Sequence, residues 1–286
     1  MEPLRMRMLV KHRGRIAVYL VLTIGSVVMI APFLFNLSKS LQTAPQTFAF
    51  PFEWIPDPFT WFNYVEAYEK IGARAFINSA LLTIVVVGGQ TILGMMAGYA
   101  FSTLRFPLRD SLLLLIIGGL MVPFHVIMIP LFIYVFEIGW YNTYWGLIIP
   151  IVAYTDVSVF MFRQFFRTVP REIYEAGILD GAGPIRVFRS LYAPLAGPTV
   201  AAFVIVSFLA AWNLYAWPFL AVADSDLWVV TLQLGVAGGT FNASSSPLRP
   251  EILAAMSLLS MVPVMAVFMF MQRRFVESMA RSGMTG

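Results

Sequence analysis

The sequence predicts an all-α, polytopic membrane protein, and three observations lead to this class. Hydrophobic residues make up 59% of the 286 residues and charged residues only 12%, against roughly 45–50% and about 25% in soluble domains. The mean hydropathy is +0.78. Several apolar stretches approach the roughly 20 residues that cross a hydrocarbon core of about 30 Å, and the short alternating strands of a membrane barrel are not found. Helices are therefore expected to cross the bilayer.

Six transmembrane helices are expected, with a retained first span. Its basic start and apolar run could also belong to a signal peptide, but the run exceeds the roughly 7–15 residues of such a segment and no Ala-x-Ala site follows. We expect a basic N-terminal segment at 1–15, a transmembrane domain at 16–271 and a tail at 272–286. The spans, in chain order, are Ile16–Phe35, Ile77–Phe101, Ser111–Ile129, Tyr144–Phe162, Ala196–Phe219 and Ile252–Phe270.

The basic residues predict the orientation. With six spans both termini lie on one side, and every Lys and Arg falls on that side except Lys39, Lys70, Arg74 and Arg249. The positive-inside rule therefore predicts that both termini and the loops after the second and fourth spans are cytoplasmic. The net charge of +4 is a topology signal, and no nucleic-acid partner is expected because no soluble domain carries the charge. The absence of cysteine excludes disulfides and Cys-ligated metal.

The two outward segments are small. The first, 36–74, carries several prolines together with Trp54 and Trp61, and is expected to form an irregular cap with interfacial aromatics. The second, 221–251, contains the Gly- and Ser-rich loop Gly238–Pro247. Neither is long enough for a separate domain that captures solute, so capture is expected from another chain.

The cytoplasmic segment 163–193 predicts an elbow of two helices. We expect Thr168 to cap a short helix with Pro170 in its first turn, the run 180–183 to end that helix, and Pro184 to begin a second one. Residues spaced three apart are expected to give the second helix an apolar face, namely Ile185, Phe188 and Leu191.

The tip of this elbow combines a carboxylate with small residues. Glu175 lies near the turn, and small side chains allow a partner's backbone to come close. The elbow is therefore a candidate docking surface, with an amphipathic loop lying on the membrane as the alternative. The small residues are Ala176, Gly177, Gly181 and Ala182.

The elbow resembles the EAA loop of ABC importer permeases, whose pattern is Glu-Ala-Ala, three residues, Gly, nine residues, Ile-x-Leu-Pro. Glu175-Ala176-Gly177, Gly181 and Leu191-Tyr192-Ala193-Pro194 keep that spacing, while Gly177, Leu191 and Ala193 replace the Ala, Ile and Leu of the pattern. Three further stretches are similar to carbohydrate-importer permeases: 212–218 (Trp-Asn-Leu-Tyr-Ala-Trp-Pro), 104–109 and the tail 272–286. The chain thus resembles the six-span, type I permease subunit of maltose and glycerol-3-phosphate type importers.

This resemblance implies a subunit of the bacterial inner membrane that works with other chains. The partners it implies are a second homologous permease, a P-loop ATPase dimer, an extracytoplasmic solute-binding protein and a carbohydrate-type substrate. The chain has no G-x-x-x-x-G-K-[ST] sequence, so we expect no enzyme activity and no cofactor in it, with ATP and Mg²⁺ bound by the ATPase. The residues that the resemblance implies for ATPase docking are Glu175, Ala176, Gly177, Asp180, Gly181, Ala182 and Pro194.

Candidates for the substrate path are polar or aromatic residues within spans. A carboxylate at the membrane centre costs about 2.5–3.5 kcal/mol on insertion scales, so Asp156 is expected to face the bundle interior, a partner or water. Sugar binding and structural hydrogen bonding are equally weighted alternatives for the role of Asp156. The other candidates, each with packing as the alternative, are His125, Trp212 and Asn213. The Gly94-xxx-Gly98 pair in the second span predicts close helix packing, within the chain or between subunits.

An ion-coupled secondary transporter is the alternative function. Such carriers usually show repeated halves with broken helices, and no convincing internal repeat is found in this sequence. An intramembrane protease is disfavoured because the chain lacks paired membrane aspartates and an H-E-x-x-H sequence. The solute itself stays open among maltodextrin, another oligosaccharide, a monosaccharide and a glycerophosphodiester.

Overall fold

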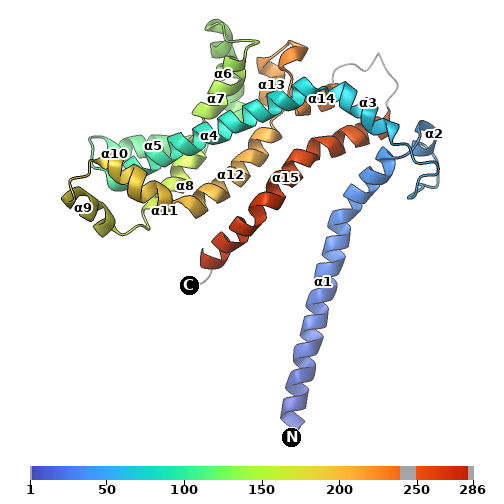
Figure 1. Cartoon of the computed structure of the whole chain (residues 1–286), viewed down its shortest axis with the longest axis horizontal. Coiled ribbons are helices and arrows are strands. Elements are labelled where there is room, and N and C mark those ends of the chain that lie inside the picture. The colour runs from blue at the N-terminus through green and yellow to red at the C-terminus, as the bar shows by residue number, and fades with distance from the viewer. Residues whose placement is uncertain (1, 239–248, 283–286) are drawn as a thin grey trace. The chain divides into compact units, whose positions relative to one another are not determined.

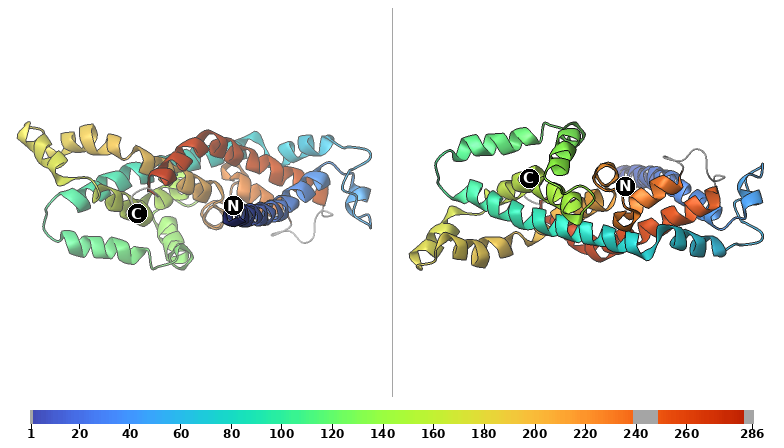
Figure 2. Two further views of the ribbon diagram at one scale, coloured as in Figure 1. Left: turned by 90° about the horizontal axis from the view of Figure 1, so that it is seen from below. Right: turned by 90° about the horizontal axis from the view of Figure 1, so that it is seen from above.

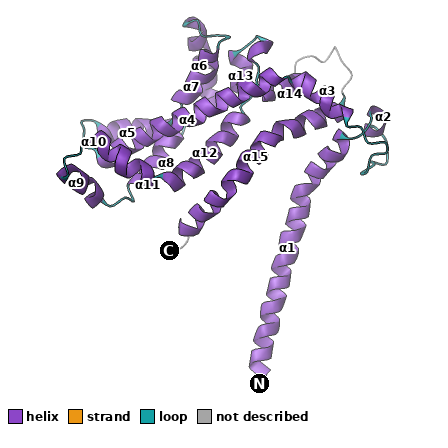
Figure 3. Cartoon of the chain, in the orientation of Figure 1, coloured by secondary structure: helices purple, strands orange, loops and turns teal. Residues whose placement is uncertain are grey.

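The computed structural model describes residues 2–238 and 249–282, with side chains for residue 15 and for 18–238 and 249–272. In these ranges the chain forms helices and loops only, without a strand (Figures 1 and 3). Most of the loop Gly238–Pro247, the side chains of the basic N-terminal residues up to Arg13, and the side chains of the tail from Arg273 onward lie outside the described residues.

The chain divides into two compact units. Unit 1 contains Met1–Lys70 and Ala237–Leu259, and unit 2 contains Ile71–Val236 and Ser260–Gly286. In unit 1 lie α1 (Glu2–Ser40), α2 (Ala44–Thr47), α3 (Phe62–Ile71) and the start of α15 (Pro250–Ser282). Unit 2 holds the rest of α15 and α4 (Ala73–Thr103), α5 (Arg109–Gly119), α6 (Phe124–Glu137), α7 (Tyr144–Ala153), α8 (Asp156–Phe166), α9 (Arg171–Leu179), α10 (Pro184–Val187), the π-helix η1 (Phe188–Tyr192), α11 (Ala193–Leu195), α12 (Gly197–Trp212), α13 (Ala216–Ala221), the 3₁₀ turn η2 (Ser225–Leu227) and α14 (Val230–Ala237).

Membrane-crossing helices are abundant, as expected. Within the described residues, four helical stretches are long and apolar enough to cross a bilayer, and up to six are if each of two sharply bent pairs counts as one span. The six-span count and the cytoplasmic side of the termini remain predictions. The four stretches are Val18–Ser40, Ala73–Thr103, Tyr144–Phe166 and Pro250–Gln272.

The expected third span, Ser111–Ile129, is not one straight helix. It consists of α5 and α6, which are bent by 101° at a short break (Figure 2). Before the break, Leu120, Met121 and Val122 donate tight backbone hydrogen bonds to the third residue back. Pro123 follows and has no N–H to donate, which favours a helix end at this point.

The expected fourth and fifth spans are also interrupted. Tyr154 and Thr155 separate α7 from α8, and residues 213–215 separate α12 from α13. Within α7, Pro150 cannot donate to the carbonyl of Gly146, four residues back. The buried indole of Trp217 donates to that oxygen instead, at 3.2 Å, and to the Leu147 oxygen at 3.1 Å. The indole thus satisfies the carbonyl that Pro150 leaves without a helical donor.

Glycines bring α4 and α8 together. A Cβ on Gly94 would lie 2.5 Å from the Cβ of Ser158, and a Cβ on Gly98 would lie 2.7 Å from the backbone nitrogen of Arg163. Only glycine permits this approach, and small residues serve the same purpose in other membrane helix pairs. The predicted Gly-xxx-Gly packing is thus found within the chain.

The loops of unit 2 lie at two ends. At one end, which we call the Asn142 end, the Asn142 side chain accepts hydrogen bonds from the N–H groups of Ala223 and Asp224. At the other, the elbow end, the hydroxyl of Tyr99 donates to the Pro184 carbonyl at 3.0 Å. The loops expected outside and those expected in the cytoplasm therefore gather at different ends of the unit.

Unit 1 contains residues 36–70 of the cap expected at 36–74. Its interior is polar: the Asn63 amide donates to the carbonyls of Ser40 and Gln42 at 2.9 and 2.8 Å. Its aromatic residues include exposed rings, as expected for an interfacial segment, such as Trp61. An ion-pair network joins the cap to the start of α15: Arg249 binds Glu66 at 2.7 Å and the buried Glu251 at 2.8 Å. Hydrogen bonding to Glu251 raises the pKa of Arg249.

Candidate functional site

The elbow forms at 163–193, but its first helix begins differently from the expectation. Pro170, and not Thr168, occupies the N-cap position of α9. The Thr168 hydroxyl donates to the Phe165 carbonyl at 2.7 Å, so it serves the end of α8. The predicted cap was therefore wrong, because the hydroxyl finds a backbone acceptor on its N-terminal side.

Gly181 ends α9 by its backbone conformation. Its φ of +77° lies in the left-handed region, which glycine adopts without steric cost. The N–H of Gly181 donates to Ile178 O and the N–H of Ala182 donates to Gly177 O, each at 3.0 Å. This pair of bonds is a Schellman motif, which satisfies the last carbonyls of a helix. Gly181 therefore shapes the elbow, and a Cβ at this position would meet nothing nearby.

Gly177 holds the two arms of the elbow together. It is buried, and a Cβ there would lie 2.9 Å from Val187 Cγ2 and 3.2 Å from Leu191 Cδ1. Its small size serves contact inside the chain, whereas we expected it to admit a partner's backbone. The arm beyond it joins an apolar cluster with Tyr192 and Phe166.

The outer face of the elbow carries charge and apolar surface. Glu175 is exposed and forms an exposed ion pair with Arg171 at 3.1 Å, a kind of pair that contributes little to stability and leaves the carboxylate able to change partners. Leu179 is 87% exposed and Ile185 83% exposed. Ile185 thus departs from the expected shared face, since Phe188 and Leu191 pack inward. The remaining docking candidates are exposed at Ala176, Asp180 and Pro194 and half-buried at Ala182.

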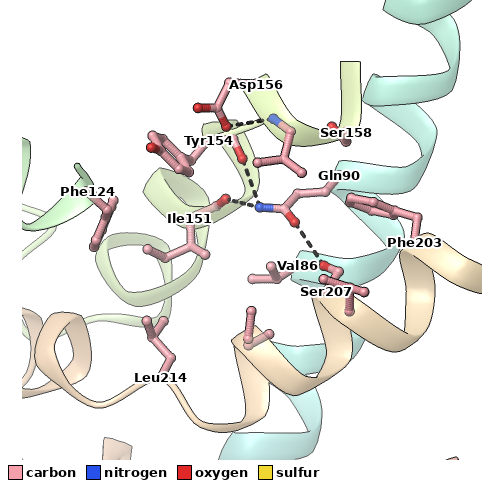
Figure 4. A pocket seen from close by; sticks show the side chains of 14 residues that line it. Val86, Gln90, Phe124, Ile151, Tyr154, Asp156, Ser158, Phe203, Ser207 and Leu214 are labelled. Carbon is pink, nitrogen blue, oxygen red and sulfur yellow. Dashed lines mark hydrogen bonds between the residues drawn. The ribbon is translucent and has the colours of Figure 1, made fainter. Parts of the chain in front are cut away.

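A second feature of unit 2 is a cavity of about 280 Å³ between α4, α8 and α12 (Figure 4). Most of its lining is apolar, and α6 contributes Phe124. The polar residues that reach it are Gln90, Tyr154, Asp156, Ser158 and Ser207. An apolar cavity with a few convergent polar groups is the usual form of a small-molecule site.

Gln90 ties three helices together beside this cavity. Its amide nitrogen donates to the carbonyls of Ile151 and Tyr154, at 2.8 and 2.9 Å, where the break after α7 leaves backbone oxygens without helical donors. Its amide oxygen accepts from the Ser207 hydroxyl of α12 at 2.9 Å. Sequence reasoning missed both residues, although a glutamine inside an apolar span was a visible signal.

Asp156 occupies the first turn of α8 and is 8% exposed. Its Oδ1 accepts a hydrogen bond from the N–H of Val157 at 2.8 Å. Its Oδ2 is buried and forms no hydrogen bond of good geometry with the described residues, although the Tyr154 hydroxyl lies near the carboxylate. A carboxylate in the first turn is favoured by the helix dipole, and the unpaired oxygen can accept a hydrogen bond from a hydroxyl group that enters the cavity.

The other three substrate-path candidates do not line this cavity. His125 is exposed on α6, next to the lining residue Phe124. Trp212 is buried, stacks on Phe208 and donates its indole N–H to the Ser260 carbonyl at 3.1 Å, as expected of a packing residue. Asn213 is exposed and donates to the Leu209 carbonyl at the end of α12. Of the four candidates, only Asp156 faces the cavity.

Comparison with known proteins identifies the family of this chain. Residues 90–281 match the family described as the binding-protein-dependent transport system inner membrane component. The sn-glycerol-3-phosphate transport system permease protein UgpE of Yersinia enterocolitica is 30% identical over 273 residues, covering 92% of this chain and 95% of that protein. The diacetylchitobiose uptake system permease protein NgcG of Streptomyces coelicolor is 31% identical over 264 residues, covering 91% and 85%.

A solved structure has the same fold. It is a chain from a bacterial ABC transporter involved in the import of the acidic polysaccharide alginate, with a TM-score of 0.81 over 92% of this chain and 97% of that one. The sequence identity is 19%, so this likeness concerns the fold alone.

Proposed function

The chain belongs to the binding-protein-dependent transport system inner membrane components, and from this premise we propose that it forms half of the translocation path of an ATP-driven importer for a carbohydrate. It is a multi-pass permease subunit of the bacterial inner membrane. Its relatives are named for glycerol-3-phosphate and for diacetylchitobiose, both of them small and rich in polar oxygen atoms. A carbohydrate or related solute is therefore the substrate class.

The outer face of the elbow is the observation that carries this proposal. Glu175, Leu179 and Ile185 are exposed there, and exposed apolar side chains of this size on a cytoplasmic loop are suited to contact with a partner protein. A groove on a cytoplasmic ATPase, with a basic residue facing Glu175, is the partner with the right chemistry. ATP and Mg²⁺ are bound by that ATPase dimer, and this chain contributes no catalytic residue.

Coupling runs from the elbow to the cavity through direct contacts. Tyr99 of α4 is hydrogen-bonded to Pro184 and its ring lies 4.9 Å from that of Tyr192, so a shift of the elbow moves α4. Further along α4, Gln90 is bonded to α7 and α12 beside the cavity. Closure of the ATPase dimer then reorients the helices around the solute. A second permease completes the path, and an extracytoplasmic solute-binding protein delivers the substrate.

Charge reversal at Glu175 tests the docking. We expect Glu175→Arg to weaken association with the ATPase by about thirtyfold or more, because losing one partner of a charge pair buried in an interface costs about 2–5 kcal/mol. The measurement is the amount of ATPase that co-purifies with the tagged chain in mild detergent. Glu172→Arg, the same reversal one turn earlier on α9, is the matched control and should retain the ATPase.

Two results would contradict the docking proposal. One is normal ATPase association and transport by Glu175→Arg. The other is uptake by the isolated chain that follows an ion gradient without any ATPase, which would favour a secondary transporter.

Asp156 is the substrate-path residue that we propose to bind solute. Replacing it with asparagine keeps its size but removes the charge, and charge-assisted hydrogen bonds contribute about 1.5–3 kcal/mol. We expect Asp156→Asn to lower uptake by about tenfold or more in proteoliposomes that contain the assembled importer, with subunit assembly unchanged. Ser158→Ala is the control, since that hydroxyl is already bonded to the Thr155 carbonyl. Equal uptake by both variants would make Asp156 a structural group.

A further inference from the structure

We propose that a cluster of arginines at the elbow end of unit 2 binds the phosphate headgroup of an anionic membrane lipid. Arg105 lies in the loop between α4 and α5, and Arg109 is the first residue of α5. Arg163 lies in the last turn of α8, and Arg167 follows that helix. The helix α8 packs against α4 and α5, and Arg163 is close enough to Arg109, Arg167 and Asp110 to interact with them electrostatically. These residues therefore form one site although they are far apart in sequence.

Most of the positive charge in this cluster is not paired with a carboxylate of the described residues. Arg105, Arg163 and Arg167 form no ion pair with any described carboxylate, and Asp110 pairs only with Arg109, at 3.0 Å. The Nε of Arg163 is buried and has no acceptor among the described residues. A buried charged donor is unfavourable unless it is paired. An anion with several acceptor oxygens is the group that would pair with it, and guanidinium groups suit phosphate in particular.

A groove lies beside two of these arginines, Arg105 and Arg109. It has a volume of about 390 Å³ and is lined by the segment from Arg105 to Ser111, including Phe106 and Leu108. Leu108 has a φ of +59°, a conformation that bulky residues rarely adopt. Strained backbone of this kind concentrates at binding sites, and in this case it shapes the turn that places Arg109 at the groove.

The surroundings of the groove favour a lipid over a soluble phosphate. Directly after Arg109, α5 presents exposed apolar side chains, with Leu112 45%, Leu114 72% and Leu115 75% exposed. A lipid could place its phosphate at Arg163 and Arg109 and its acyl chain along this leucine surface. It would then pair with the arginines and cover the exposed leucines. The site also lies where α4, α5 and α8 have their predicted cytoplasmic ends. Basic pockets between helices on that side bind anionic lipid headgroups in other membrane proteins.

Lipid titration of the purified full-length chain tests this site. Native mass spectrometry in detergent would measure binding of phosphatidylglycerol and of zwitterionic phosphatidylcholine. We expect selective binding of phosphatidylglycerol, and a loss of about 25-fold in its affinity in Arg163→Gln/Arg167→Gln, since each basic residue near an anionic lipid contributes about fivefold. Arg186→Gln/Arg189→Gln removes two exposed arginines from the elbow, and this matched control should bind as the unaltered chain does.

Asp110→Asn gives an independent test that does not disturb packing, because the Asp110 side chain is 83% exposed. Removing this carboxylate frees Arg109 and should tighten phosphatidylglycerol binding about fivefold. Three results would overturn the proposal: equal losses in the two double variants, binding of soluble glycerol phosphate as tight as that of the lipid, or loss of the co-purified ATPase with lipid binding intact. The last result would assign the cluster to the ATPase interface.

Discussion

Replacing Gly98 with leucine should prevent stable folding of the helix pair at the centre of unit 2. The first atom of the new side chain would lie 2.7 Å from the backbone nitrogen of Arg163 and 2.8 Å from the Cβ of Phe162. Backbone atoms cannot move aside as a flexible side chain can. We therefore expect the free energy of unfolding to fall by about 3 kcal/mol or more. The measurement is the yield of monodisperse protein and its thermal unfolding temperature in detergent.

Gly88 provides the control on the same helix. A Cβ at Gly88 would meet no atom within 4 Å, and leucine favours helix over glycine by up to about 1 kcal/mol. Gly88→Leu should therefore fold at least as well as the unaltered chain. If Gly98→Leu matched it in yield and unfolding temperature, the close approach of α4 and α8 would be incorrect.

Gln90→Leu is expected to have the second largest effect. Leucine has a similar volume but leaves the Tyr154 carbonyl and the Ser207 hydroxyl without the partners that Gln90 provides. Each buried polar group left unsatisfied costs about 1–3 kcal/mol. We expect the free energy of unfolding to fall by about 2 kcal/mol or more, which would be measured as a lower unfolding temperature in detergent.

Thr91→Val is the matched change for this test. The Thr91 hydroxyl donates to the Val87 carbonyl within the same helix at 2.6 Å. Removing this hydroxyl therefore breaks no hydrogen bond between helices. Unfolding temperatures that agree between Gln90→Leu and Thr91→Val would mean that the link from α4 to α7 and α12 adds no stability.

Hydropathy predicted the helical class and the continuous spans well. The span expected at Ile77–Phe101 is α4, Ala73–Thr103, because one unbroken apolar run coincides with one unbroken helix. The same reasoning could not find the breaks at Met121 or Thr155, since average hydropathy carries no information about backbone hydrogen bonds. Prolines near those positions were visible, but a proline in a membrane helix is often tolerated without a break.

The candidate site was predicted in part, for a related reason. Glycine and proline mark the ends of the elbow helices directly, so their positions in the sequence were informative. The hydrogen bond between Gln90 and Ser207 joins residues 117 positions apart, and no local pattern indicates such a pair. His125, Trp212 and Asn213 were selected by residue type, whereas cavity lining depends on which face of a helix points inward.

In mechanical terms, α4 is a continuous helix, whereas the neighbouring spans are interrupted. Its 31 residues span about 46 Å without interruption. Asn78 and Ser79 fasten it at the Asn142 end, through hydrogen bonds to Trp228 O and from Val230 N, and Tyr99 fastens it at the elbow end. The neighbouring helices α7 and α8 are separated at Tyr154 and Thr155. In the coupling proposed above, α4 is therefore the uninterrupted helix that joins the elbow end of unit 2 to its Asn142 end.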